Sequence, residues 1–354
     1  MIPDRLHEVL RANPDALGAR DYDVTKLQGD ASSRMYFRAR AGERSVIAMV
    51  LPDNQPTSLA EEITKVSGEI TELPFINVQK FFAPAIRVPK IHAYDAGRGV
   101  LLLEDFGDDL LLSVIERSDD PARERIYEKA LDELAKISSL ARPALPCLAF
   151  QRRYDRDLYN WEFLHFVEYA IDRPLAGRVS PTDRDGILSA LYAVTDRYLD
   201  WECVVSHRDY HARNLLLLPN AQHDIGVIDF QDALLAPVFY DLASLLRDSY
   251  FAIEPNSQAR LLETYRAKVA SRGLKMTASK DEFRFAFDLM GLQRNMKAAG
   301  RFFYIDIVKK NPNYLKDVPR AVGYIRSTLE NHGELRALRA RLLPLLDDIV
   351  QKAG

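Results

Sequence analysis

Two apolar runs, 215–218 and 225–228, constrain the fold of this chain more than any other feature. They lie within the stretch 205–250, which reads VSHRDYHARNLLLLPNAQHDIGVIDFQDALLAPVFYDLASLLRDSY. The polar residues between the two runs include a Pro-Asn pair and predict a turn, so the runs are interpreted as the paired strands of a short β-hairpin. Asn214 precedes the first strand and Asp229 follows the second. The hairpin would therefore bring these two side chains close together.

Three polar residues around this hairpin match the needs of phosphoryl transfer from ATP. Asp209 lies five positions before Asn214, and Asp229 follows on the second strand. The reaction needs a carboxylate to accept the proton of the attacking hydroxyl and oxygen ligands that hold Mg²⁺ against the phosphates. The order and spacing are those of a kinase catalytic loop and its second Asp. We expect Asp209 to be the catalytic base and Asn214 and Asp229 to be the metal ligands.

Two other interpretations of the same residues remain open. His207 and His211 are four residues apart, as in some zinc sites. The Glu of the H-E-x-x-H motif is absent, however, and the surrounding sequence predicts strand and loop. His207 is therefore interpreted as a packed histidine that holds the loop. Alternatively, Asp209, Asn214 and Asp229 only form turns.

The same segment resembles the aminoglycoside phosphotransferase superfamily of small-molecule kinases. The resemblance includes IDFQDA at 228–233 and YDLASLLRD at 240–248. It is greatest to the bacterial anomeric kinases of N-acetylmuramate and N-acetylglucosamine, through GDASSRMYFR at 29–38, VLLLEDFGD at 100–108 and GLQRNMKAAGRFFY at 291–304. It implies an α+β, protein-kinase-like fold with a small antiparallel-sheet N-lobe (1–105) and a larger, mainly helical C-lobe (106–354). It also implies that Asp241 hydrogen-bonds the backbone of the catalytic loop.

Nucleotide-binding residues follow from the resemblance in two places. A strand–loop–strand with a small, polar tip can place backbone N–H groups around phosphate oxygens, although an ordinary hairpin turn would look the same. The residues of this tip are Gly29, Asp30, Ser32, Ser33 and Arg34. Glu104 and Phe106 lie in the expected hinge between the lobes, where kinase-like folds bind adenine through backbone groups.

Met49 is a departure from the wider superfamily. It lies in the predicted strand 45–51 at the position where kinases carry a lysine for the α- and β-phosphates. Another cation must then assist the phosphates, and Arg34 at the loop tip is the first candidate. Arg38, Lys65 or a more metal-dependent site without a cation are the alternatives.

Cationic residues on a predicted helix mark the acceptor side. Arg294, Lys297 and Arg301 are spaced by three and four residues, which aligns them on one face of a helix over 282–304. Such a stripe is either solvated surface or a binding face. Because it overlaps the segment that resembles the acceptor-side helix of the muramate kinases, we expect it to pair with the lactyl carboxylate of the sugar. Glu162 is a candidate acceptor for a substrate hydroxyl.

Hydrophobic patterns predict the remaining elements. A chain of 354 residues exceeds the usual size of one core and predicts two units. The expected strands are 24–28, 35–39, 45–51, 91–94 and 100–104. The expected helices are 4–17, 58–73, 75–82, 109–115, 122–140, 154–171, 184–203, one that begins at 240, 282–304 and two within 318–352.

Composition limits the partners and the location. The formal net charge of −3 argues against a nucleic-acid binder that works by bulk charge. The N-terminus lacks the apolar core of a signal peptide, and no run approaches the roughly 18 apolar residues of a membrane span. We therefore expect a cytoplasmic protein with a small-molecule sugar as substrate, no membrane contact and no obligate protein partner. Cys147 and Cys203 form no metal or disulfide pattern and are interpreted as reduced packing residues.

These features together predict an ATP- and Mg²⁺-dependent kinase. It would phosphorylate the anomeric hydroxyl of N-acetylmuramate or N-acetylglucosamine in cell-wall sugar recycling. A kinase of aminoglycosides, choline or homoserine is one alternative, but cationic acceptors need clustered carboxylates, whereas the cationic stripe favours an anion. The other alternative is a nucleotide-binding pseudoenzyme, which Met49 favours and the conjunction of Asp209, Asn214 and Asp229 opposes.

Overall fold

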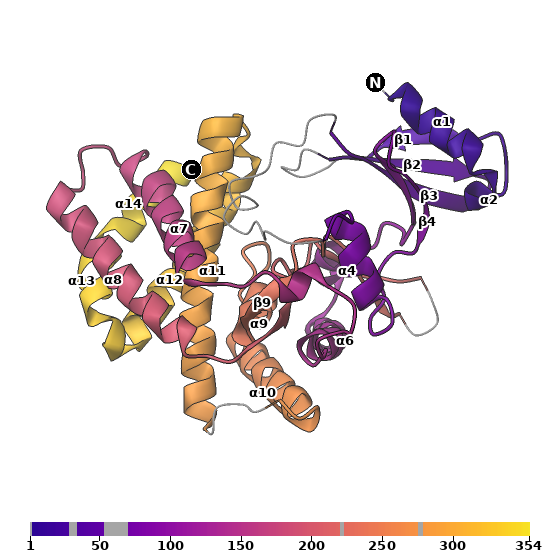
Figure 1. Cartoon of the computed structure of the whole chain (residues 1–354). Coiled ribbons are helices and arrows are strands. Elements are labelled where there is room, and N and C mark those ends of the chain that lie inside the picture. Colours follow the sequence, from indigo (N-terminus) through magenta and orange to yellow (C-terminus); the bar gives the residue numbers. More distant parts are fainter. Residues whose placement is uncertain (1, 28–33, 53–69, 220–222, 275–278) are drawn as a thin grey trace.

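The computed structural model describes residues 2–27, 34–52, 70–219, 223–274 and 279–354, which form two lobes (Figure 1). The N-lobe is built on a five-stranded antiparallel sheet with the strand order β1-β2-β3-β5-β4. The strands are β1 (Asp23–Lys26), β2 (Met35–Ala41), β3 (Arg44–Val50), β4 (Ile91–Asp95) and β5 (Val100–Glu104). The C-lobe is mainly helical, so the predicted fold class is confirmed.

The two faces of the N-lobe sheet belong to different cores. One face is covered by α1 (Asp4–Ala12) and α2 (Pro14–Leu17), whose apolar side chains pack on Phe37 and Leu102. The single helix predicted over 4–17 is interrupted at Asn13, and the proline that follows starts the second helix. These helices bury sheet surface and are part of the N-lobe core.

The other face of the sheet continues into the C-lobe. Met49 and Leu101 belong to the same buried cluster as the C-lobe helices. The helix α4 (Pro74–Phe82) lies between the lobes (Figure 1), and the rings of Phe75 and Phe230 are 4.8 Å apart between centroids. Because the lobes share this core, the boundary expected near residue 106 stays a prediction.

The C-lobe contains the predicted hairpin and a pair of short strands beside it. β7 (Leu215–Leu217) pairs antiparallel with β8 (Ile225–Val227), and β6 (Cys203–Ser206) pairs with β9 (Leu234–Pro237). The C-lobe helices are α5 (Leu111–Arg117), α6 (Asp120–Ser138), α7 (Arg156–Phe166), α8 (Pro181–Leu199), α9 (Phe239–Leu246), α10 (Pro255–Ser271), α11 (Lys280–Lys309), α12 (Val318–Asn331), α13 (Arg336–Leu342) and α14 (Leu346–Ala353).

Several predicted boundaries were wrong. α10 was not predicted at all, and the segment 318–352 forms three helices instead of two because Gly333 and Pro344 interrupt the helical run. α8 ends at Leu199, and the chain is already extended at Cys203. The predicted helix 58–73 falls almost wholly in a stretch outside the described residues.

In the described parts of the chain, no helix combines the length and apolar character that crossing a membrane requires.

α7 and α11 cross at very close range. A Cβ atom added at Gly300 of α11 would lie 2.8 Å from the Cα of Phe166 and 3.1 Å from its backbone nitrogen. Only glycine allows this approach, since backbone atoms cannot move aside as the end of a side chain can. The contact sets how near the middle of α11 lies to α7.

We predict that Gly300→Ala destabilises the protein by about 1–3 kcal/mol, because the added methyl group overpacks this crossing. The matched control is Gly323→Ala in α12, where an added Cβ meets nothing within 4 Å. The control variant should gain up to about 1 kcal/mol from helix propensity. Urea unfolding of both variants measures the difference. A Gly300→Ala variant as stable as the control would contradict the close crossing.

Candidate active site

Asp241 fixes the backbone of the catalytic loop through hydrogen bonds. Its carboxylate accepts the backbone N–H of His207 at 2.6 Å and that of Arg208 at 3.0 Å. Arg208 has a φ of 80°, a left-handed conformation that is unfavourable for a residue with a long side chain. Burial raises the pKa of Asp241, although the charge and the backbone N–H of His207 oppose the change. The role that the resemblance implies for Asp241 is confirmed.

His207 connects this loop to the hairpin. The backbone N–H of Asp209 donates to its Nδ1 at 3.3 Å, so Nε2 carries the proton that is donated to the carbonyl of Ile228 at 2.9 Å. The ring is fully buried. Both nitrogens are used in these contacts, which confirms the packed histidine and leaves neither nitrogen for a zinc ion.

The structure brings Asp209, Asn214 and Asp229 together. The side-chain amide of Asn214 donates to the backbone carbonyl of Asp209 at 2.9 Å, and Ile228 N–H donates to the carbonyl of Asn214 at 3.0 Å. The amide oxygen of Asn214 is therefore turned away from the loop carbonyl. Asp229 follows directly, with a left-handed φ of 63°.

The electrostatics around Asp229 suit a divalent cation. Burial raises the pKa of Asp229, and the nearby carboxylates of Asp232 and Asp209 raise it further, against the opposing effects of Gln231 and Arg34. Mg²⁺ usually binds one or two carboxylates together with substrate phosphates, so one carboxylate and one amide oxygen are a sufficient set of protein ligands. Among the described residues, no three His, Cys, Asp or Glu side chains form a metal cage of their own.

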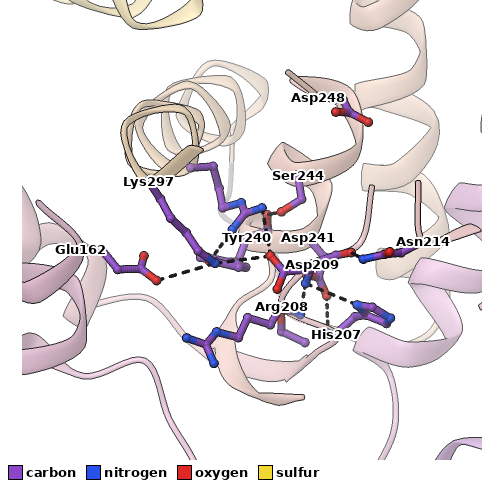
Figure 2. A network of polar contacts seen from close by, with 12 residues as sticks. Glu162, His207, Arg208, Asp209, Asn214, Tyr240, Asp241, Ser244, Asp248 and Lys297 are labelled. Atoms are coloured by element: carbon purple, nitrogen blue, oxygen red, sulfur yellow. Dashed lines mark hydrogen bonds and ion pairs between the residues drawn. The ribbon is translucent and has the colours of Figure 1, made fainter. Parts of the chain in front are cut away.

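Asp209 faces two cations from α11. Arg294 Nη2 and Lys297 Nζ each lie 3.4 Å from the same carboxylate oxygen, Oδ1. Figure 2 shows Lys297 beside Asp209. Burial would raise the pKa of Asp209, but Lys297, Arg294 and Arg208 outweigh it and hold the pKa well below the usual value. The side chain is still 36% exposed. Asp209 is therefore an ionised carboxylate that a small molecule can reach.

A buried network supports these cations. The hydroxyl of Tyr240 lies 2.8 Å from Arg294 Nη1, 3.1 Å from Lys297 Nζ and 2.6 Å from the hydroxyl of Tyr154. Glu162 accepts the hydroxyl of Tyr154 at 2.6 Å and lies 3.6 Å from Lys297. Only 2% of the Glu162 side chain is exposed, and it is in contact with these protein groups. Its role as an acceptor for a substrate hydroxyl stays a prediction. Sequence reasoning missed Tyr154 and Tyr240, since aromatic residues on helices are usually core.

The cationic stripe lines a cavity beside Asp209. The lining of the cavity includes Asp209, His211, Asp248, Arg294, Lys297 and Arg301. Arg301 lies over the ring of Tyr304, 4.8 Å from its centroid, and no described carboxylate pairs with it. Burial lowers the pKa of His211 to about 3, so this ring is neutral. All three residues of the stripe therefore line the cavity, and Arg301 is also exposed to solvent.

The described part of the phosphate loop is Arg34; Gly29, Asp30, Ser32 and Ser33 lie outside the described residues. Burial raises the pKa of both Tyr36 and Asp229, and the positive charge of Arg34 opposes both shifts, so its guanidinium lies near the expected metal site. Burial and the charge of Asp229 nevertheless raise the pKa of Tyr36 to about 12. Met49 is buried opposite Tyr36 in the sheet.

Arg38 and Lys65 are the other candidate cations for the phosphates. Arg38 binds Asp105 at 2.7 Å and Asp108 at 2.6 Å, so its side chain ties β2 to the hinge and does not replace the lysine. Arg38 was an alternative to Arg34, and two carboxylates already offset its charge in this structure. Lys65 lies outside the described residues.

The hinge residues Glu104 and Phe106 flank an apolar surface. Glu104 pairs with Arg87 and accepts the backbone N–H of Lys90 at 3.2 Å. Phe106 packs against Leu216 and Leu218 of the hairpin, and the Arg87 guanidinium lies 5.1 Å from its ring centroid. The side chains of both residues are thus used within the protein, and the backbone N–H of Glu104 donates to the carbonyl of Lys90 at 2.8 Å. Adenine binding by the other backbone groups of this hinge stays a prediction.

Comparison with known proteins agrees with this geometry. The model of the phosphotransferase enzyme family matches residues 23–275. A protein of Neisseria meningitidis named N-acetylmuramate/N-acetylglucosamine kinase is 30% identical over 95% of this chain and 94% of its own. A protein of the same name from Pseudomonas aeruginosa is 32% identical over 91% of this chain and 88% of its own.

Solved structures match the fold at low sequence identity. A choline kinase of Streptococcus pneumoniae superposes with a TM-score of 0.60 at 14% identity, over 91% of this chain and 99% of its own. An ADP-bound aminoglycoside phosphotransferase superposes with a TM-score of 0.58 at 12% identity, over 92% of this chain and 98% of its own.

We predict that Asp209→Asn lowers kcat by about 100-fold or more, because a general base of this kind contributes roughly 10²–10⁴-fold. Nucleotide affinity should be unchanged or higher, since the substitution removes a negative charge near the phosphates. Asp229→Asn is the contrasting variant and should weaken Mg²⁺-dependent ATP binding instead. Turnover assays and nucleotide titrations separate the two effects. Wild-type turnover in Asp209→Asn would contradict the assigned base.

Proposed function

The chain belongs to the phosphotransferase enzyme family, and we propose that it transfers the γ-phosphoryl group of ATP to the anomeric hydroxyl of N-acetylmuramate or N-acetylglucosamine. The observation that carries the proposal is an ionised, reachable Asp209 between the Asn214–Asp229 pair and a cationic cavity. The sugar follows from four relatives that bear the name N-acetylmuramate/N-acetylglucosamine kinase. We expect the reaction to take place in the cytoplasm, which supplies ATP.

Asp209 orients the acceptor and takes its proton. As the bond between the acceptor oxygen and the γ-phosphorus forms, the bond to the β-phosphate oxygen breaks and ADP leaves. The transition state of such transfers is loose, so position and charge neutralisation matter more than base strength. A carboxylate with a low pKa can therefore serve, especially with an anomeric hydroxyl, which is more acidic than an ordinary alcohol.

Residues of the hairpin, the loop tip and the hinge would bind the nucleotide and its metal ion. Asn214 and Asp229 would hold Mg²⁺, which supplies positive charge to the phosphates when it is bound. Arg34 contributes a second positive charge beside Asp229. The tip residues Gly29, Asp30, Ser32 and Ser33 are proposed to surround the phosphates, and the backbone of Glu104 and Phe106 to bind adenine.

The cavity favours an anionic acceptor over a cationic one. Arg301 has no carboxylate partner among the described residues, and Arg294 and Lys297 add two further positive charges to the same wall. The carboxylates on this wall are Asp209 and Asp248, and Asp248 accepts the backbone N–H groups of Ala212 and Tyr250. An amine would meet net positive charge here, whereas a lactyl carboxylate would meet Arg301.

Assays of ATP consumption with both sugars, an aminoglycoside, choline and homoserine test the proposed acceptor. We expect turnover with at least one of the two sugars and none with the amines. If only the amines consumed ATP, the proposed substrate would be wrong and the kinase chemistry would stand.

We predict that Arg301→Gln raises KM for N-acetylmuramate about 10–100-fold, the value of one charge-assisted hydrogen bond. KM for N-acetylglucosamine, which lacks the lactyl carboxylate, should change by less than about 3-fold. Lys309→Gln, which removes the same charge at the end of α11 away from the cavity lining, is the control and should affect neither sugar. Equal changes for both sugars in Arg301→Gln would argue against a carboxylate at this position.

A further inference from the structure

We propose that Lys297 is a catalytic residue that neutralises the phosphoryl group during transfer, and that α11 thereby supplies a cation that the third strand lacks. The inference rests on the phosphoryl transfer proposed above but not on the identity of the acceptor. It assigns Lys297 to the transferred group, whereas Arg301 remains the residue for the acceptor's carboxylate.

The third strand cannot supply this charge. Met49 is fully buried in β3 between Tyr36 of β2 and Leu101 of β5. Its side chain is part of the core that the two lobes share, and a thioether carries no charge. Positive charge at the phosphates, beyond that of the metal and of Arg34, therefore has to come from another element.

The position of Lys297 follows from its contact with the base. Its Nζ is 3.4 Å from Asp209 Oδ1. The attacking oxygen must lie within about 2.6–3.2 Å of the same carboxylate, and the phosphorus about 3–3.5 Å beyond that oxygen. A cation that already touches the carboxylate can therefore reach an equatorial phosphoryl oxygen by rotating its side chain, with no movement of the helix.

Lys297 is held loosely enough to make this change. Among the described residues, its ammonium group contacts Tyr240 at 3.1 Å, Asp209 at 3.4 Å and Glu162 at 3.6 Å (Figure 2). The two distances to carboxylates are long for charge-assisted hydrogen bonds. Glu162 is buried and provides a negative charge that keeps the ammonium group near the base. The arrangement therefore holds a mobile ammonium group close to the place where the negatively charged phosphoryl group would be transferred.

The neighbouring cation is less free. Arg294 Nη1 donates to the Tyr240 hydroxyl at 2.8 Å, and its guanidinium lies 4.9 Å from the centroid of that ring. Its side chain is 10% exposed, against 21% for Lys297. Arg294 is therefore positioned to stay in contact with Asp209. Lys297 is the cation that can turn away from Asp209 toward the phosphoryl group.

The catalytic-loop residues that line the cavity are Asp209 and His211, and neither offers an alternative positive charge. His211 is two residues after Asp209 and lines the same cavity, but its burial keeps the ring neutral. In the transfer step, the acceptor proton goes to Asp209 and the ammonium group of Lys297 keeps all its protons. Its charge offsets the negative charge on the transferred phosphoryl group as one P–O bond breaks and the other forms.

Kinetics with the two sugars distinguish this role from carboxylate binding. Lys297→Met should lower kcat about 100–1,000-fold with both N-acetylmuramate and N-acetylglucosamine and change each KM little, as expected for a group that stabilises only the transition state. Lys297→Arg should recover part of the lost kcat. Arg301→Gln is the matched control and should change KM for N-acetylmuramate only. A Lys297→Met effect confined to KM for N-acetylmuramate would overturn the proposal.

A second measurement does not depend on the acceptor. Aluminium fluoride with MgADP mimics a planar phosphoryl group in transfer, and it should tighten ADP binding to the wild-type protein. Lys297→Met should lose most of this tightening while binding ADP alone as the wild type does, which also shows that the variant is folded. Equal tightening in both proteins would overturn the role of Lys297. If the wild type used neither sugar, the proposed acceptor would fail, and this measurement would still decide the role of Lys297.

Discussion

The bond between the Asp241 carboxylate and two consecutive backbone N–H groups is the constraint on which the site depends. It holds Arg208 in a left-handed conformation that costs roughly 1–3 kcal/mol and that turns Asp209 into the cavity. Asp241 lies on the short helix α9, which is buried along its whole length. It also carries Tyr240, whose hydroxyl contacts both cations beside Asp209. One rigid helix therefore positions the catalytic loop and the groups that set its charge.

α11 is the second support, and it brings in Arg294 and Lys297, which lie 85 and 88 positions after Asp209 in the sequence. The close crossing at Gly300 fixes its distance from α7, and one turn earlier Lys297 lies between Glu162 of α7 and Asp209. The cations are effective because they are partly buried. In water, pairs at 3.4 Å would be worth little, whereas at 10–21% exposure the same charges determine the ionisation of Asp209.

The sequence was sufficient for features that depend on local chemistry. The turn after β7 predicted the hairpin, and the hairpin predicted that Asn214 and Asp229 approach each other. The rotation of a helix about its axis depends on distant packing, so the sequence showed that Arg294 and Lys297 share a face but not that this face meets Asp209. For the same reason, it could not show that Glu162 points into the protein, where Tyr154 and Lys297 hold it.

The loss of the strand lysine has a consequence for how the lobes work together. A lysine on β3 would belong to the N-lobe, and its distance from the catalytic base would change whenever the lobes move. Lys297 belongs to the same lobe as Asp209 and contacts it directly. With Lys297 in the role proposed above, the base and the cation stay on the same lobe in every position of the N-lobe, and lobe closure has only to deliver the nucleotide. Met49 can then be an apolar residue of the core that joins the lobes.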